Sequence, residues 1–160
     1  MKATAPPTGT DQAGLVDKVI QRHAGRPGAL LPILREVQAE LGWISEDSMK
    51  RIATALEIPW GQVYGTATFY TLFATRPQGR HVIRVCESAP CHVAGAAAVL
   101  AELEKQLGVS PGETTADGRF TLELTSCIGI CGVAPAIMIG DEVHGNLAPE
   151  MIVDVLAKYE

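Results

Sequence analysis

The sequence predicts a mixed α/β protein in which a small bundle of helices precedes a separate α/β domain. Up to about residue 78, apolar residues recur three or four positions apart, as they do along one face of a helix. Beyond residue 79, short β-branched runs alternate with an alanine-rich helical stretch, and Arg76-Pro77-Gln78-Gly79 reads as a turn between the two patterns. With 160 residues and 47% hydrophobic content, the chain is long enough to give each part its own core.

The N-terminal half is expected to be helical after a short tail. Residues 1–10 are rich in proline, threonine and glycine and predict a flexible tail, and residues 11–78 predict the helical domain. Glycines, Pro59 and the N-cap residue Ser45 delimit its helices. The expected helices cover residues 11–24, 28–41, 46–58 and 60–73. Each has one apolar stripe, so the helices must pack on one another or on a partner.

Large aromatic side chains in this half allow two interpretations. Their spacing is typical of core packing, and docking of a partner is the alternative. The residues concerned are Trp43, Trp60, Phe69 and Phe73.

The C-terminal half, residues 79–160, predicts a domain in the order strand, helix, strand, hairpin and helix. Gly140-Asp141 suits a two-residue hairpin turn. The expected strands are residues 81–85, 120–124, 136–139 and 142–144, and the expected helices are residues 93–107 and 149–158.

Charge and hydropathy narrow the function classes. The net charge is −5, and residues 81–160 hold four Lys or Arg against eleven Asp or Glu, which argues against a nucleic-acid surface. The sequence shows neither a signal-peptide core at its start nor a run of about 18 apolar residues. We therefore expect a cytoplasmic protein, in which cysteines serve as metal ligands or redox thiols more often than as disulfides.

The four cysteines are the candidate cofactor site. Cys86 and Cys91 are separated by four residues, Cys127 and Cys131 by three, and each pair directly follows a predicted strand. Two loops at the same end of a sheet could bring all four thiols together. A [2Fe–2S] cluster needs such a set of four thiolates, two on each iron, so we expect all four cysteines to be its ligands. Glycines in Cys127-Ile128-Gly129-Ile130-Cys131-Gly132 would let the backbone fold closely around the sulfurs.

Other cysteine chemistries fit less well. A four-cysteine zinc site stays open, although zinc knuckles favour two-residue gaps, and an absorption spectrum would decide because zinc is colourless. Two disulfides fit the count but not the compartment, and the Cys-x-x-Cys of a thioredoxin dithiol is absent. A Rieske centre needs two histidine ligands, and His92 beside Cys91 reads better as a loop residue. No residue is predicted to be catalytic, and the glycines do not form a dinucleotide-binding loop.

The sequence resembles the thioredoxin-like [2Fe–2S] subunit that accompanies the flavin subunit of respiratory complex I, of NAD-linked hydrogenases and of NAD-dependent formate dehydrogenases. The resemblance covers about residues 27–157 and is most specific at the two cysteine pairs. Four segments carry it: Leu31-Pro32-Ile33-Leu34 with Gly42-Trp43, Ala67 to Phe73, Val85 to Cys91, and Cys127 to Pro135.

The resemblance implies an N-terminal helical bundle, a thioredoxin-like domain and a role as an electron-transfer subunit. The partner subunit would bind FMN, NAD(H) and a [4Fe–4S] cluster, and the cluster of this chain would exchange electrons with that flavin. The run from Cys131 to Pro135 and the compact length look closer to the soluble hydrogenase and formate dehydrogenase relatives, with complex I as the alternative host. A free-standing ferredoxin is a further alternative, although a free carrier would not need the helical half. The sequence leaves open whether NAD or NADP is used.

One backbone feature depends on the fold analogy. In thioredoxin-like folds the proline before the strand beside the active site is often cis, and Pro135 precedes residues 136–139 in the same way. Proline makes a cis bond accessible, but an ordinary trans bond is compatible with the sequence as well.

Overall fold

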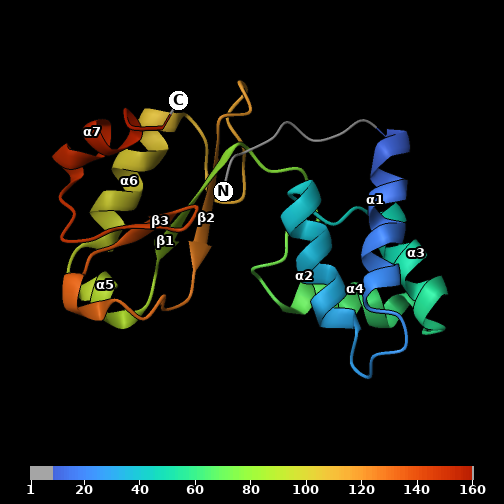
Figure 1. Cartoon of the computed structure of the whole chain (residues 1–160). Coiled ribbons are helices and arrows are strands. Elements are labelled where there is room, and N and C mark those ends of the chain that lie inside the picture. The colour runs from blue at the N-terminus through green and yellow to red at the C-terminus, as the bar shows by residue number, and fades with distance from the viewer. Residues whose placement is uncertain (1–8, 160) are drawn as a thin grey trace. The chain divides into compact units, whose positions relative to one another are not determined.

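The computed structural model describes residues 9–159, which divide into two compact units between Pro77 and Gln78 (Figure 1). We call residues 9–77 the helical unit and residues 78–159 the α/β unit. Each unit has its own cluster of fully buried apolar side chains. Within the described residues, no helix is both long enough and apolar enough to cross a membrane.

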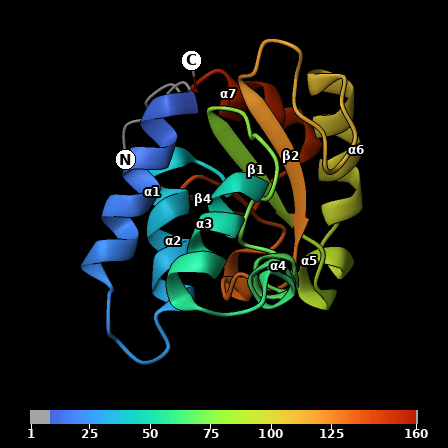
Figure 2. The ribbon, with the colours of Figure 1, turned by 90° about the vertical axis from the view of Figure 1, so that its right-hand side faces the viewer.

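The helical unit consists of four helices around one core. They are α1 (Gly9–Arg22), α2 (Leu30–Leu41), α3 (Glu46–Leu56) and α4 (Trp60–Phe69). α1 packs against α2 and α3, and α4 packs against α3 (Figure 2). The predicted stripes supply the core, because Val16, Leu34, Val37 and Ile52 are all buried.

Local signals explain where these helices end. Gly42 takes the left-handed conformation (φ 81°) that closes α2, and the Ser45 hydroxyl accepts a hydrogen bond from the N–H of Ser48 at 3.1 Å to begin α3. The start expected at residue 11 is wrong, since residues 9 and 10 already belong to α1, whereas residues 1–8 of the expected tail lie outside the described part. The fourth helix ends at Phe69 rather than at residue 73, because Tyr70 turns to an extended conformation.

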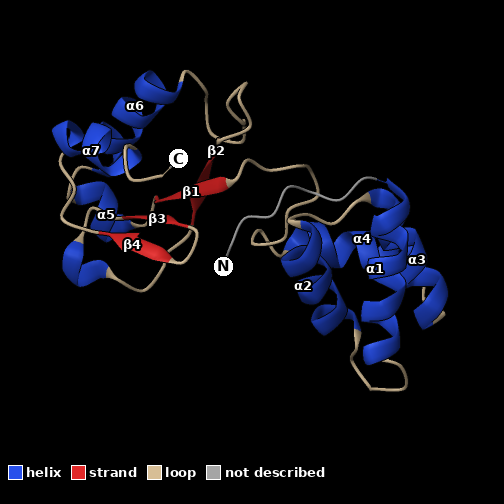
Figure 3. Cartoon of the chain, turned by 45° about the horizontal axis from the view of Figure 1, so that its top comes forward, coloured by secondary structure: helices blue, strands red, loops and turns tan. Residues whose placement is uncertain are grey.

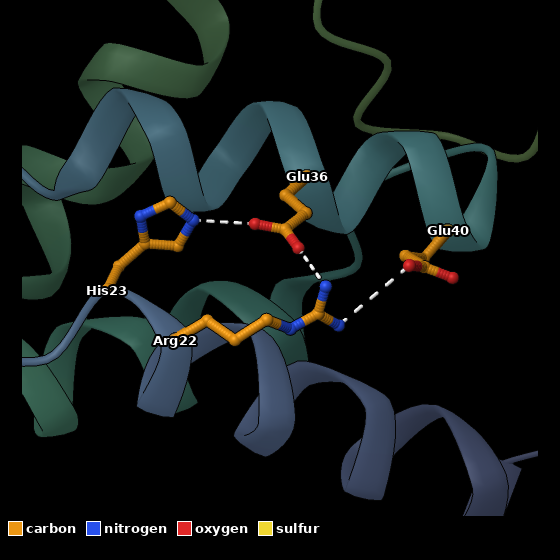
Figure 4. A network of polar contacts seen from close by, with 4 residues as sticks. All are labelled: Arg22, His23, Glu36 and Glu40. Atoms are coloured by element: carbon orange, nitrogen blue, oxygen red, sulfur yellow. Dashed lines mark hydrogen bonds and ion pairs between the residues drawn. The ribbon is translucent and has the colours of Figure 1, made fainter.

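Polar contacts join the end of α1 to α2 (Figure 4). The His23 ring nitrogen Nε2 lies 2.6 Å from Glu36 Oε2, and Arg22 pairs with the other oxygen of Glu36. Arg22 also approaches Glu40, at 3.8 Å. The pKa of Glu36 is held below its usual value, chiefly by the hydrogen bond with His23, with a further contribution from Arg22.

The core interpretation of the aromatic residues is wrong for the side chains of α4. Phe69 is 76% exposed and Trp60 is 40% exposed, whereas Phe73 packs partly buried against the core. The sequence spacing did not reveal this, because α4 buries only Val63 and Ala67 and leaves its aromatic side chains outside.

The α/β unit is built on a four-stranded mixed sheet in the order β2-β1-β3-β4. The strands are β1 (His81–Cys86), β2 (Phe120–Thr125), β3 (Ile137–Ile139) and β4 (Glu142–His144). β1 and β2 run parallel, and β3 is antiparallel to both β1 and β4. The helices are α5 (Ala89–Val93), α6 (Ala96–Leu107) and α7 (Ile152–Leu156), with 3-10 turns at Cys131–Val133 and Pro149–Met151.

α6 and α7 cover one face of this sheet (Figure 3). Leu103 of α6 and Ile152 of α7 share a core with Ile83 and Val85 of β1, all of them fully or almost fully buried. The strand–helix–strand connection of the parallel pair β1 and β2 follows the predicted order.

Two predicted helices of this unit have different bounds in the structure. The helix expected over residues 93–107 begins at Ala96, because Gly95 takes a left-handed conformation (φ 101°) and separates it from the short α5. The helix expected over residues 149–158 opens as a 3-10 turn and is α-helical only over Ile152–Leu156.

The peptide bond between Ala134 and Pro135 is cis, so the cis alternative is confirmed. Pro135 lies two residues before Ile137, the first residue of β3, which begins one residue later than the strand expected over residues 136–139.

Candidate iron–sulfur site

The parallel pairing of β1 and β2 brings the two cysteine loops to one edge of the sheet. Cys86, the last residue of β1, is the register partner of Thr125, the last residue of β2. Cys127 follows only two residues later. Both loops therefore leave the same ends of neighbouring strands, as the sequence predicts.

The first cysteine pair is buried. Cys86 is 1% exposed and Cys91 is 2% exposed, and their side chains interact with each other. Cys91 lies on α5, which the sequence analysis did not predict, although Pro90 near the helix start is a signal for it. Ile128 and Ala134 from the second cysteine loop pack against this pair, so the two loops share one small core.

The second cysteine pair is exposed. The sulfurs of Cys127 and Cys131 lie 3.6 Å apart. Two sulfurs bound about 2.3 Å from one tetrahedral metal ion lie about 3.8 Å apart, so this spacing suits two ligands of a single iron. The N–H of Gly129 donates to Cys127 Sγ at 3.4 Å, and Gly129 has a left-handed φ of 83° that favours glycine.

Backbone N–H groups and mutual repulsion set the acidity of these thiols. Burial raises the pKa of Cys86, but the N–H groups of Ser88 and Ile128 and the thiol of Cys91 outweigh burial, and the net shift is downward. Burial first, and then Cys86, raise the pKa of Cys91. Cys127 is the main cause that raises the pKa of Cys131. Cys86 and Cys131 also raise the pKa of Cys91 electrostatically.

The donor set fits a cluster with two irons. All four cysteines are free thiols arranged as two pairs, and a [2Fe–2S] core takes two thiolates on each iron. Among residues 9–159, no three or more His, Cys, Asp or Glu side chains lie close enough to hold one metal ion together. His92 is exposed, and the ring nitrogen Nε2 of His144 lies 2.6 Å from the hydroxyl oxygen of Tyr159.

The sequence analysis missed the donors that face the sulfurs. The N–H groups of Ser88 and Ile128 face Cys86, and the N–H of Ala136 faces Cys91. Any residue except proline supplies an N–H, so no residue type in the sequence marks these positions.

Comparisons with known proteins agree with a [2Fe–2S] cofactor. The family model for the thioredoxin-like [2Fe–2S] ferredoxins matches residues 16–160. A subunit of the NADH-quinone oxidoreductase of Pseudomonas aeruginosa is 44% identical over 131 residues, which cover 82% of this chain and 79% of that protein. The NADP-reducing hydrogenase subunit HndA of Solidesulfovibrio fructosivorans is 36% identical over 144 residues, which cover 90% of this chain and 84% of that protein.

A solved structure of an NAD+-reducing [NiFe]-hydrogenase in the H2-reduced state has a similar fold. It superposes with a TM-score of 0.70 and 28% identity over 81% of this chain. The matched part spans only 22% of that hydrogenase chain.

Proposed function

The chain belongs to the thioredoxin-like [2Fe–2S] ferredoxin family, whose cofactor is a [2Fe–2S] cluster. We therefore propose that it is an electron-transfer subunit of an NAD(P)H-linked oxidoreductase complex. Cys86, Cys91, Cys127 and Cys131 are the proposed ligands. The observation that carries the proposal is the convergence of two cysteine pairs at the ends of β1 and β2. When bound, the cluster takes up and passes on one electron at a time.

The protein's own residues would hold the cluster and shape its surroundings. The buried pair, with Ile128 and Ala134 packed against it, excludes water from one side of the site. The exposed pair leaves the other side open to a partner, so the second cysteine loop is the route for electrons. Backbone N–H groups directed at sulfur would stabilise the negative charge of the cluster.

The proposed partner is a flavin subunit that binds FMN, NAD(H) and a [4Fe–4S] cluster. A hydride delivers two electrons at once, and a one-electron centre beside the flavin can accept one of them. The relatives named as subunits of an NADH-quinone oxidoreductase and of an NADP-reducing hydrogenase support a place in such a complex.

The exposed aromatic side chains of α4 and the residues that follow it support docking through the helical unit. Phe69 is 76% exposed and Leu72 is 59% exposed, and no residue between positions 58 and 75 is charged. An uncharged apolar surface of this kind suits a protein interface. Replacing Phe69 with serine should weaken assembly of the complex, whereas Met151→Ser, at a 42% exposed position of the α/β unit, serves as the control.

Two hosts remain candidates. The 44% identity to a subunit of an NADH-quinone oxidoreductase favours complex I, and the hydrogenase subunit that matches 90% of this chain favours a soluble hydrogenase. The preference for a hydrogenase or formate dehydrogenase that arose from the sequence therefore remains a prediction. Purifying the tagged chain from its native cells and identifying its partners decides between proton-pumping subunits and a hydrogenase or formate dehydrogenase subunit.

A spectroscopic experiment tests the proposed function itself. The isolated protein should contain iron and acid-labile sulfide in equal amounts and should give a [2Fe–2S] electron paramagnetic resonance signal after reduction. With four thiolate ligands, its potential should be on the order of −400 mV. A colourless zinc protein, or a potential above zero, would contradict the proposed ligation.

A further inference from the structure

The segment between β4 and the following 3-10 turn lies directly against the second cysteine loop. A Cβ atom at Gly145 would lie 2.6 Å from both Cβ and Cγ2 of Val133 and 2.7 Å from the Val133 carbonyl oxygen. No side chain fits there unless Val133 moves. Position 145 therefore accepts only glycine while Val133 stays where it is. The reason is lack of space, because the φ angle of Gly145 is not in the left-handed region that favours glycine.

Two backbone hydrogen bonds fasten the same contact. The N–H of Asn146 donates to the Val133 carbonyl at 2.6 Å, and the N–H of Leu147 donates to the Pro135 carbonyl at 3.1 Å. Leu147 is 5% exposed and belongs to the core of the α/β unit. The segment is thus anchored on its own side, so a clash at Gly145 has to be relieved by movement of the cysteine loop.

The 3-10 turn carries such a movement to the sulfur of Cys131. This turn spans Cys131–Val133, and the N–H of Ala134 donates to the Cys131 carbonyl at 3.3 Å. Val133 is therefore only two residues from Cys131 and in the same turn. A shift of Val133 changes the position of the Cys131 thiol relative to the other three.

We infer that residues 145–147 position the cysteine loop for the cluster, and that Gly145 is a positioning residue. This inference rests on the proposed role of Cys131 as a ligand. Mutating a residue that holds a metal ligand in place changes the affinity for the metal about 10- to 100-fold. The reduction potential of an iron–sulfur cluster depends in addition on hydrogen bonds to the sulfurs and on their exposure to solvent. Gly145→Ala should therefore speed cluster loss to a chelator about tenfold and shift the reduction potential.

Gly79→Ala is the matched control, because it introduces a similar clash in the same unit. A Cβ atom at Gly79 would lie 2.8 Å from the carbonyl carbon of Phe120, at the start of β2 and at the opposite end of that strand from the cysteines. Both variants should lower the melting temperature. Only Gly145→Ala should also change the rate of cluster release, the reduction potential and the visible circular dichroism of the loaded protein.

A second variant shows whether the clash itself is responsible. Val133→Gly removes the two side-chain atoms that a Cβ at position 145 would meet and leaves the Val133 carbonyl oxygen at 2.7 Å. Gly145→Ala combined with Val133→Gly should therefore lose its cluster more slowly than additive effects predict, although faster than the unaltered protein. If Gly145→Ala alone does not fold, recovery of loaded protein in the double variant supports the inference, and no recovery contradicts it.

Two results would distinguish a failure of the positioning role of Gly145 from a failure of the proposed ligand set. Equal release rates and unchanged potentials in Gly145→Ala and Gly79→Ala would overturn the positioning role while leaving the ligands in place. A Cys131→Ala protein that keeps an unaltered cluster would overturn the proposed ligand set, and with it the basis of this inference.

Discussion

The two cysteine pairs differ in what each residue contributes to the site. Cys86 and Cys91 are buried among apolar side chains, and burial disfavours the ionised thiolate, an effect that the nearby N–H groups outweigh at Cys86 but not at Cys91. Cys127 and Cys131 are exposed, and Gly129 supplies an N–H to Cys127. The buried pair therefore suits a role in fixing the cluster, and the exposed pair a role in passing electrons.

Replacing Cys91 with alanine should remove the cluster almost completely, because one iron would lose a thiolate in a site that excludes other ligands. Serine at this position should leave a weakened cluster at most, since its oxygen is a harder ligand than sulfur. Iron content and the visible spectrum measure both effects. The control is His92→Ala, which changes the exposed residue next to Cys91 and should keep the full iron content. An intact four-thiolate spectrum in Cys91→Ala would contradict the proposal that Cys91 is a ligand.

The position of the two cysteine loops at one edge of the sheet could be predicted, because the cysteine spacing and the order of strands along the chain can be read from the sequence. Cys86 and Cys127 each follow a β-branched or alternating run, and the parallel pairing of β1 and β2 then brings the loops together. Gly145 could not be predicted in the same way. Glycine is required at position 145 because Val133, twelve residues earlier in the chain, lies against it in the folded structure. The sequence alone does not show that these two residues are in contact.

At the scale of single elements, helix ends with clear sequence signals were predicted well, whereas the short helical turns of the two cysteine loops were missed. Gly42 caps the end of α2 and Ser45 caps the start of α3, as the sequence indicates. By contrast, α5 and the 3-10 turn at Cys131–Val133 are too short to show a period of 3.6 residues. Their geometry depends on packing between the cysteine loops rather than on local preference.

Ser45 begins α3 and gives a direct test of helix capping. Its hydroxyl accepts from the N–H of Ser48 at 3.1 Å and lies 2.8 Å from the hydroxyl of Ser48, a buried residue. Ser45→Ala should destabilise the helical unit by about 1 kcal/mol, because an N–H at the helix start and a buried hydroxyl lose their partner. Urea unfolding measures the change. Ser45→Asp preserves a capping oxygen and should lose clearly less stability than Ser45→Ala. Equal losses of stability in the two variants would contradict the capping role of Ser45.

The contact between α1 and α2 should make the stability of the helical unit depend on pH. The pKa of Glu36 in the folded protein lies below its usual value of 4.5, mainly because of the hydrogen bond with His23. A carboxyl group with a lowered pKa stabilises the fold above its unfolded pKa, and this contribution is lost as the pH falls through the folded value.

Glu36→Gln should therefore lower the melting temperature of the helical unit at pH 7, and the difference from the unaltered protein should shrink steadily below about pH 4.5. Glu40→Gln is the control, because Glu40 lies 3.8 Å from the same Arg22, farther than the contacts of Glu36. A difference that stays constant from pH 7 to pH 3 would show that the effect of Glu36 is not electrostatic.

At the scale of the whole molecule, the chain combines two cores with different dependence on the cofactor. The core of the helical unit is assembled from α1 to α4 and contains no cysteine. All four proposed ligands lie in the α/β unit, where the packing of Cys86 and Cys91 continues into both cysteine loops. A bound group stabilises the part of the protein whose folded state it binds, so the cluster should stabilise the α/β unit alone.

Removal of the cluster with a chelator under reducing conditions should therefore lower the midpoint temperature at which the α/β unit unfolds. The midpoint temperature of the helical unit should stay the same. Calorimetry of loaded and stripped protein measures the two midpoints, and Ser45→Ala identifies the transition of the helical unit by shifting that one alone. If stripping lowers both midpoints equally, the two units unfold together and the cores are not thermodynamically separate. If it lowers neither, the cluster binds without constraining the loops, which would contradict the buried environment of Cys86 and Cys91. A shift confined to the transition that Ser45→Ala leaves unchanged is the expected result, because the ligands and the capped helix belong to different cores.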